Sequence, residues 1–371
     1  MRHVVSRLAA AAAAVALGAA QAPQGPPASL IQNGRVETRQ ATAIDREIAP
    51  VATANAEPAW LIWRVPMVAG DRELCNSYYN DRSVYSRAFV MDWNPPGAGG
   101  AAAPKIAPPT GPVPIEAGTG LLVLVRTLDG GVERVRTLAD DCPIDAGGRT
   151  VYWLGGVTTA ESLRFLESLT RSDRADRFSA DSRRNVAQSA VTAISLHRDA
   201  AADAVLDRLA ASDTDRELRG QAASALGSTR GAHGLATLER LLAAEKDADM
   251  RRSLVGALGL TREPGTVNAL RPLLRDADAR IRAEAIYWFA QRGGTSVIGE
   301  VTKLVEAEAD DTVRRRGVSG LARLPASDAV PALLQLARSS PNALVRREAV
   351  SALSNSRDPR AMAFMEELIR R

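Results

Sequence analysis

The chain has 371 residues, of which 46% are hydrophobic and 24% are charged, a globular composition that excludes a wholly disordered protein. Lysine and arginine together number 47 and aspartate and glutamate 43, and this near balance argues against a general polyanion binder. With three histidines and two cysteines, the chain has little material for metal sites or histidine-dependent catalysis.

Residues 1–22 have the pattern of a secretory signal peptide. Arg2 and Arg7 form a basic start, an apolar stretch follows over residues 8–17, and small residues predict cleavage after Ala20 or Ala22. The stretch is too short for a spanning helix, although a retained anchor helix is the alternative. We therefore expect an exported protein, periplasmic or secreted, with no membrane span in its mature chain.

The next segments predict a small β-rich domain over residues 58–175. Residues 23–57 are rich in Ala, Pro, Gln and Thr and predict a flexible leader or a partly ordered arm. A Pro/Gly-rich loop occupies 94–119, and Asp129-Gly130-Gly131 is typical of a hairpin turn. Thr158 or Thr159 would cap a helix over 158–170 that joins the domain to the rest of the chain. β-branched and aromatic residues predict strands over 60–68, 84–93, 121–128, 132–138 and 150–154.

Cys75 and Cys142 are the only cysteines, and in an oxidising compartment an even count predicts a disulfide. A bridge that closes this loop would stabilise the fold by roughly 4 kcal/mol. Two free buried thiols are the alternative. The tryptophans of this region favour a domain core over an aromatic ligand cleft. If the cleft were real, the domain could carry an enzyme site, and the residues to probe would be Trp60, Trp63, Asp92, Trp93 and Asp141.

Residues 176–371 contain an internal repeat. Apolar anchors recur at spacings of 31 or 32 residues, an arginine follows each anchor directly, and a large apolar residue follows eight positions later. Offsets of four, five and eight residues mark one face of a helix, and a second apolar cluster marks another. Each unit is therefore a helical hairpin, and an irregular first unit near Ser182 gives about six hairpins. The anchors are Leu218, Met250, Ile281, Val313 and Val345.

The order Asp, two residues, apolar, Arg, three residues, apolar, Ala-Leu resembles the HEAT-like repeat of the phycobilisome-lyase group of α-solenoids. The match covers about residues 182–371. The resemblance implies a right-handed superhelix whose concave face is lined by the second helix of each pair. The fold class is thus α+β, with a helical superhelix after a small β-rich domain. A scaffold is implied but no activity, because no residue here marks the chemistry of the lyases.

Two rows of charged residues accompany the repeat. The acidic row and Asn342 lie three residues before the anchors, where an N-cap contributes about 1 kcal/mol. The arginine row could reach the aspartate of a neighbouring unit and form a structural ladder between repeats. An arginine stripe for an anionic ligand is the alternative. The ladder residues are Asp215, Arg219, Asp247, Arg251, Asp278, Arg282, Asp310, Arg314 and Arg346.

The usual signatures of catalysis are not found. The sequence lacks HExxH, GxSxG, P-loop and dinucleotide-binding motifs. His197 and His233 each fall in a turn between helices, where a solvated histidine is expected, and nothing places a serine beside either one. Asp213/Asp215 and Asp276/Asp278 mimic part of a calcium loop but lack its glycine and its glutamate. We expect no catalytic residue, cofactor or metal.

The main hypothesis is therefore an exported, non-enzymatic scaffold or adaptor that binds a protein partner along the concave face. An enzyme or enzyme subunit with its site in the β-rich domain is the first alternative. Nucleic-acid binding through the arginine stripe is the second, and export and the near-neutral charge argue against it. The outward residues of the second helices that we expect to contact the partner are Arg240, Arg271, Lys303 and Gln335.

Overall fold

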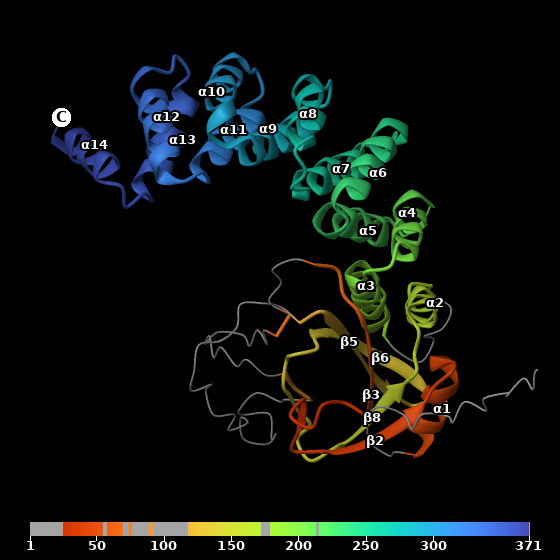
Figure 1. Cartoon of the computed structure of the whole chain (residues 1–371). Helices are drawn as coiled ribbons and strands as arrows, with labels where there is room; N and C mark the ends of the chain where they lie inside the picture. Colours follow the sequence, from red (N-terminus) through yellow and green to blue (C-terminus); the bar gives the residue numbers. More distant parts are fainter. Residues whose placement is uncertain are drawn as a thin grey trace, which may run out of the picture.

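A computed structural model describes residues 25–54, 58–69, 74–75, 89–91, 118–171, 179–212 and 215–370. A sheet-containing region comes first, and an array of helical hairpins arches away from it (Figure 1). The α+β prediction is confirmed. The signal peptide, most of the 94–119 loop, Asp92, Trp93 and Asp213 lie outside the described residues.

The main sheet has five strands in the order β2-β8-β3-β5-β6. β5 (Gly120–Leu128) and β6 (Gly131–Ala139) form the predicted hairpin, and Asp129 and Gly130 at its turn have positive φ. β3 (Ala59–Pro66) pairs antiparallel with β5 and parallel with β8 (Thr150–Gly155). These strands match the predicted ones within two residues at each end.

The two faces of this sheet are covered differently. On one face, Trp63 and its alternating neighbours pack against α1 (Ile44–Ala54) and α2 (Thr159–Leu169). On the other, Trp60 packs with residues around a small parallel sheet of β1 (Ile31–Gln32), β7 (Ile144–Asp145) and β4 (Phe89–Val90). Both tryptophans are therefore core residues, as alternation along a strand requires.

Residues 25–54 of the segment predicted as a flexible leader or a partly ordered arm are instead part of this domain. β2 (Arg35–Gln40) pairs in parallel with β8 over six residues, and Ile44 and Val51 of α1 are fully buried. The prediction was wrong because β2 is a polar edge strand whose partner lies far away in the sequence. Main-chain pairing across that distance leaves no local apolar pattern.

Cys75 and Cys142 form a disulfide, as predicted, with their Cα atoms 5.3 Å apart. Cys142 is buried beside Ile144 in the second face of the sheet. The bridge therefore ties the 74–75 segment to the small parallel sheet.

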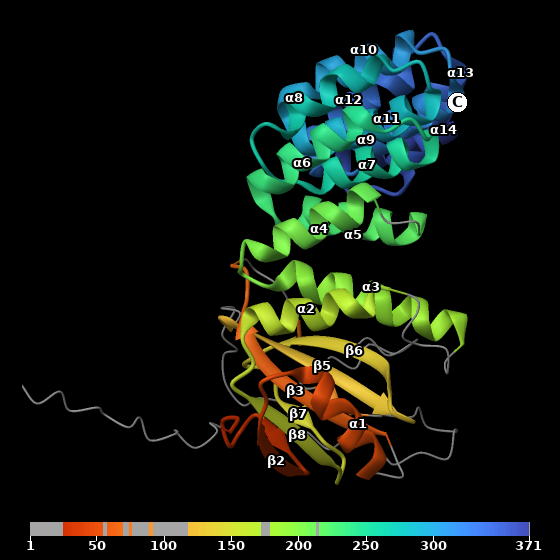
Figure 2. The ribbon, with the colours of Figure 1, turned by 90° about the vertical axis from the view of Figure 1, so that its right-hand side faces the viewer.

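The array begins where α3 (Ala180–Leu196) packs on β6 and α2, and Figure 2 shows α2 and α3 side by side over that part of the sheet. Buried apolar residues continue from the sheet into the helices as one cluster. The described residues form six hairpins, with a 3-10 turn, η2, extending the short α8: α3 (Ala180–Leu196) and α4 (Ala201–Ser212), α5 (Arg216–Thr229) and α6 (Gly231–Ala244), α7 (Ala248–Leu260) with α8 (Thr266–Leu270) and η2 (Arg271–Arg275), α9 (Ala279–Gly293) and α10 (Ile298–Ala307), α11 (Asp311–Ala322) and α12 (Ala326–Ser339), and α13 (Ala343–Ser354) and α14 (Pro359–Arg370). None of the described helices has the length and apolarity needed to cross a bilayer.

The array bends toward the first helices of its hairpins. Figure 1 shows α5, α7, α9 and α11 on the inner side of the arc and α6, α8, α10 and α12 on the outer side. Successive first helices pack closely, whereas successive second helices touch only sparsely. A methyl group on Gly227 would overlap the main chain of Ala257 in the next first helix, so glycine permits this close approach. The implied placement of the second helices on the concave face is therefore wrong.

Candidate binding surface

The predicted N-caps are all present. Asp215, Asp247, Asp278, Asp310 and Asn342 each accept hydrogen bonds from main-chain N–H groups in the first turn of the helix that follows. Each cap satisfies donors that the helix itself leaves open. The capping residues therefore recur because each hairpin needs the same start.

The arginine ladder exists, but its acidic partners are not the caps. Arg282 Nη2 lies 2.9 Å from Glu308 Oε1, and Arg282 Nε lies 3.0 Å from Glu308 Oε2. Arg251 pairs with Asp276 at 2.7 Å in the same way. The partner stands two residues before the next cap, in the turn between hairpins. Arg219 likewise pairs with Glu245.

Each acidic partner also organises its own turn. Glu308 Oε1 accepts from the N–H groups of Ala309 and Asp310, and Arg282 donates to the carbonyls of Asp276 and Ala277 in the preceding turn. The Arg282 guanidinium holds the pKa of Glu308 below its usual range. One arginine thus links two successive turns, and the ladder arginines are not an open stripe for an anionic ligand.

The ladder ends at the fifth hairpin. Ser340 stands at the position of the acidic partner, and Arg314 turns back to Asp311 in its own helix at 2.7 Å. Arg314 Nε is buried with no hydrogen-bond partner in the described structure. Arg346, the last ladder residue, donates to the carbonyls of Ser340 and Pro341. The neutral serine therefore breaks the series, and the Nε of Arg314 is left without an acceptor.

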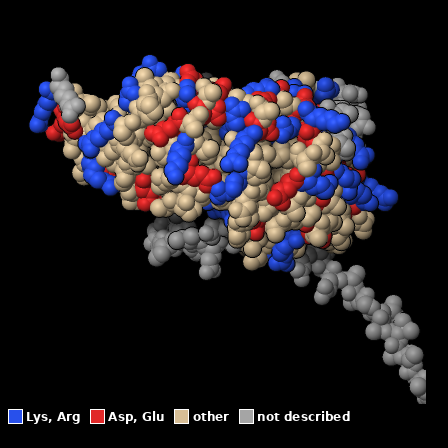
Figure 3. Space-filling view, turned by 90° about the horizontal axis from the view of Figure 1, so that it is seen from above, with Lys and Arg blue, Asp and Glu red and all other residues tan. Residues whose placement is uncertain are grey.

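The four residues predicted to contact a partner lie on the outer side of the arc. Arg240 on α6 is 3.8 Å from Asp207, and Arg271 on η2 pairs with Glu300. Lys303 and Gln335 are exposed on α10 and α12. Viewed from above, this side mixes basic and acidic residues and shows no field of a single sign (Figure 3). The role of these residues in binding stays a prediction, but they do not line the concave face.

The concave face carries an aromatic pair that the sequence analysis missed. In the other regular units, two small residues occupy the sixth and seventh positions after the anchor, and in α9 these positions hold Tyr287 and Trp288. Both side chains are half-buried, and their rings meet edge to face at 5.3 Å. The break in the small-residue pattern was the signal that could have found them. The small pairs are Ser224-Ala225, Gly256-Ala257, Ser319-Gly320 and Ser351-Ala352.

Polar groups hold this aromatic pair in place. The Trp288 indole N–H donates to Glu284 Oε1 at 2.8 Å, and Arg316 from α11 lies 3.2 Å from Glu284 Oε2. The Arg316 guanidinium also lies 4.1 Å from the centre of the Tyr287 ring. A methyl group on Gly259 of α7 would overlap the Trp288 ring, so this glycine makes the space that the ring fills. Three successive first helices thus build one preorganised aromatic site.

The joint between domain and array contains a buried chain of hydrogen bonds. Trp63 Nε1–H donates to Ser162 Oγ at 2.8 Å, and Ser162 Oγ lies 2.8 Å from His197 Nε2. His197 Nδ1 lies 2.7 Å from the Ala193 carbonyl, which can only accept, so Nδ1 carries the proton and Ser162 donates to Nε2. Contrary to the expectation of a solvated histidine with no serine nearby, His197 is fully buried beside Ser162.

The complete burial of this serine–histidine pair indicates a structural role. Ser162 and His197 are both 0% exposed, and burial lowers the pKa of His197 to about 4. Arg230 donates to the His197 carbonyl at 2.7 Å and pairs with Asp203, which fixes the turn that follows. His233 is partly exposed, 3.1 Å from Asp207. The chain of hydrogen bonds from Trp63 through Ser162 to His197 therefore holds β3, α2 and the end of α3 together.

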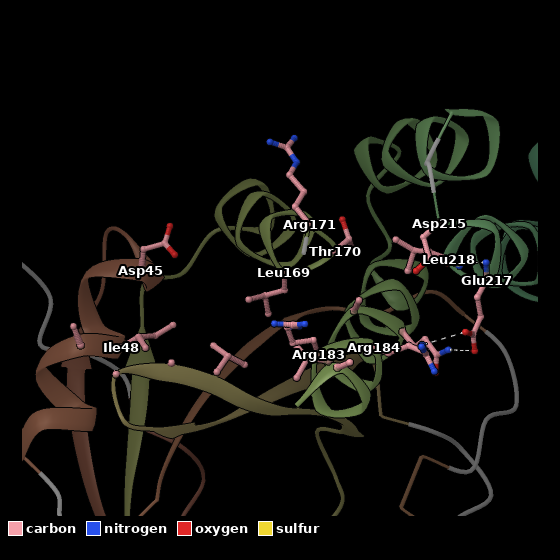
Figure 4. A pocket seen from close by; sticks show the side chains of 18 residues that line it. Asp45, Ile48, Leu169, Thr170, Arg171, Arg183, Arg184, Asp215, Glu217 and Leu218 are labelled. Carbon is pink, nitrogen blue, oxygen red and sulfur yellow. Dashed lines mark hydrogen bonds and ion pairs between the residues drawn. The ribbon is translucent and has the colours of Figure 1, made fainter. Parts of the chain in front are cut away.

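A cavity of about 310 Å³ lies where the domain meets the array. It is lined by α1, the Gly130–Gly131 turn, the end of α2, α3 and the start of α5 (Figure 4). Arg184 lies 3.3 Å from Glu217 at one end, and Gln188 donates to the same carboxylate at 2.7 Å. These charged and polar groups pair with each other between α3 and α5, so we read the cavity as a packing gap between the β-rich domain and the array. The candidate binding surface is therefore the concave aromatic site.

Comparison with known proteins gives the family of the array. A family model of HEAT repeats matches residues 235–316 and 298–371. No curated protein matches the chain.

Three solved structures are similar in part. YibA of E. coli is 24% identical over 43% of this chain and 61% of its own, with a TM-score of 0.32. Human deoxyhypusine hydroxylase in complex with glycerol is 14% identical over 56% and 91%, with a TM-score of 0.31. The CpcE–CpcF complex of phycocyanin lyase from Nostoc is 18% identical over 55% and 80%, with a TM-score of 0.32. The family match confirms the predicted HEAT repeats over residues 235–371, within the predicted range of 182–371.

Proposed function

We propose that this protein is a non-enzymatic scaffold that binds a protein partner on the concave face of its HEAT-repeat array. Tyr287 and Trp288 are the observation that carries the proposal. Aromatic and arginine side chains dominate the binding energy of protein interfaces, and here Arg316 stacks on Tyr287. Both rings are half-buried, so a partner could complete their burial.

The position of the site supports the same conclusion. α9 stands in the fourth of six hairpins, on the inner side of the arc, where a bound segment would contact several first helices. Arg315 lies 3.5 Å from Glu348, and the Gln291 amide donates to the Gly320 carbonyl at 2.7 Å. These contacts join α9, α11 and α13 side by side. The face is therefore rigid before a partner arrives, which lowers the entropy lost on binding.

The test is capture of the partner by crosslinking and pull-down from the cell envelope with the tagged, exported protein. The site variant is Tyr287→Ala with Arg316→Glu, and the control variant is Arg240→Glu with Lys303→Glu on the outer face. The expected result is a specific protein recovered with the wild type and the control but lost with the site variant, while circular dichroism shows that the array of each variant is folded. Loss with the control alone would place the interface on the outer face. Turnover of a small molecule by the chain, with recovery the same for every variant, would favour an enzyme of the β-rich domain.

We also propose that residues 1–22 direct export and that the mature protein is periplasmic or secreted. The Cys75–Cys142 disulfide supports this proposal, because such bonds persist in oxidising compartments. Mass spectrometry of the protein from the periplasmic fraction should show a chain that begins after Ala20 or Ala22. A full-length chain found only in the cytoplasm would refute export.

A further inference from the structure

The concave face of α7, α9, α11 and α13 has more basic than acidic residues. In each of these helices, counted to its C-cap, the positions one before the anchor and two, three, six and ten after it point away from the second helices. These positions hold six arginines and three carboxylates, so the formal net charge of the face is +3. The arginines are Arg252, Arg280, Arg315, Arg316, Arg323 and Arg347, and the carboxylates are Asp249, Glu284 and Glu348.

All three carboxylates form ion pairs with arginines of the same face. The pairs are Asp249–Arg280 at 3.0 Å, Glu284–Arg316 at 3.2 Å and Glu348–Arg315 at 3.5 Å. The other three, Arg252, Arg323 and Arg347, are exposed, and their side chains make no ion pair or hydrogen bond within the described residues. The unpaired charge of this face is therefore entirely positive.

The three unpaired arginines lie on both sides of the aromatic pair. Arg252 is on α7, before α9, and the other two belong to α11 and α13, after it. Packed helices are spaced by about 8–10 Å, so the way from α7 to α13 is about 24–30 Å. An extended chain advances about 3.3 Å per residue, so a segment of about seven to nine residues reaches from Arg252 to Arg347.

We propose that the part of the partner bound here is an extended acidic segment of about nine residues with an apolar or aromatic residue near its middle. This inference rests on the proposed function, because it names the chemistry of a partner at the concave site. The carboxylates of the segment pair with Arg252, Arg323 and Arg347, and its central residue covers the half-buried rings of Tyr287 and Trp288. Arginine donates two parallel hydrogen bonds to a carboxylate, and complementary charge steers a partner to its site.

A nucleic acid fits the same face less well. The Arg316 guanidinium lies 4.1 Å from the centre of the Tyr287 ring, and that of Arg292 lies 5.4 Å from the centre of the Trp288 ring. The two rings also meet edge to face, so they do not form a flat platform on which successive bases could stack. The near balance of charge over the whole chain favours a protein segment as well.

The experiment is selection of binders from a random nonapeptide display library with the mature, disulfide-bonded chain. The selected peptides should be rich in aspartate and glutamate around a central apolar residue. Fluorescence anisotropy with labelled synthetic copies then measures their affinity. It should fall at least tenfold when Arg252→Glu, Arg323→Glu and Arg347→Glu are combined, because each reversal replaces an attraction by a repulsion.

The matched control changes the charge by the same amount at exposed positions away from the concave face. It combines Arg240→Glu, Lys246→Glu and Lys303→Glu, and it should bind the peptides like the wild type. Circular dichroism of each variant establishes that the array is folded.

The outcomes separate this inference from the proposed function. Selection of neutral or basic peptides only, or acidic peptides bound equally by the concave triple variant, would overturn the acidic segment. Peptides of that kind that are nevertheless lost with Tyr287→Ala and Arg316→Glu would leave the concave protein-binding site standing. Peptides that bind equally to every variant would overturn both. Single-stranded DNA of nine nucleotides that binds more tightly than the acidic peptides, and needs the same arginines, would make the occupant a nucleic acid.

Discussion

Arg282→Ala should destabilise the array far more than Arg280→Ala, two residues away in the same helix. The Arg282 side chain is 19% exposed and that of Glu308 13%, and the pair shares two hydrogen bonds. Its removal would leave the Glu308 carboxylate unpaired and the carbonyls of Asp276 and Ala277 without their donor. Arg280, by contrast, is 54% exposed, and its partners Asp249 and Asp278 keep other contacts.

The magnitude follows from this difference in burial. Deleting one member of a buried ion pair costs 3–5 kcal/mol and of a surface pair up to 1 kcal/mol, so for half-buried Arg282 we expect about 3 kcal/mol. At the size of this array that corresponds to a fall in melting temperature of about 6–12 °C. Arg280→Ala should leave the melting temperature close to that of the wild type.

Thermal melting followed by circular dichroism measures both variants, with the disulfide intact. The double variant Arg282→Ala with Glu308→Ala should be no less stable than Arg282→Ala alone, because it removes the unpaired carboxylate together with the guanidinium. Equal losses for Arg282→Ala and Arg280→Ala would refute the ladder as the source of stability. A melting temperature unchanged by Arg282→Ala, with loss of partner capture, would make the ladder a binding site.

Three further predictions follow from other sites. Ser340→Glu should supply the missing acceptor for Arg314 and raise stability by about 1 kcal/mol, which urea unfolding measures. His197 has a folded-state pKa of about 4, below its unfolded value, so its contribution is complete above pH 6.5 and falls as the pH drops toward 4. The loss amounts to about 3 kcal/mol by pH 4, and His197→Gln should remove this slope from the urea midpoints measured between pH 7 and 4.5. Gly259→Ala should lower the melting temperature through overlap with Trp288, and Trp288→Ala in the same chain should restore much of it.

The hairpins and their caps could be predicted because their signals are local and repeated. The anchor spacing defines the period, and a residue such as Asp247 caps the helix that starts directly after it. The partners of the arginine row could not be found in this way. Glu245, Asp276, Glu308 and Ser340 share a position but not a residue type, so their role becomes visible only when the turns are placed side by side.

The predictions for the joint and for the leader were wrong for a different reason. Ser162 and His197 belong to different helices, and nothing in their local sequence shows that α2 packs against α3 with both residues inside. β2 has a polar sequence and pairs with a strand that follows more than a hundred residues later. Contacts between distant segments depend on the whole fold, and the hydrophobic periodicity of the sequence does not predict them.

The direction of curvature links the packing of the array to its binding surface. Glycines such as Gly227 let the first helices approach, and this compression puts those helices on the inner side of the arc. An aromatic side chain on a first helix therefore needs a matching gap in the neighbouring helix. Gly259 provides that gap for Trp288, and Glu284 orients the ring. A binding site on this face thus takes coordinated residues in adjacent units, which is why one hairpin can depart from the small-residue pattern while the others keep it.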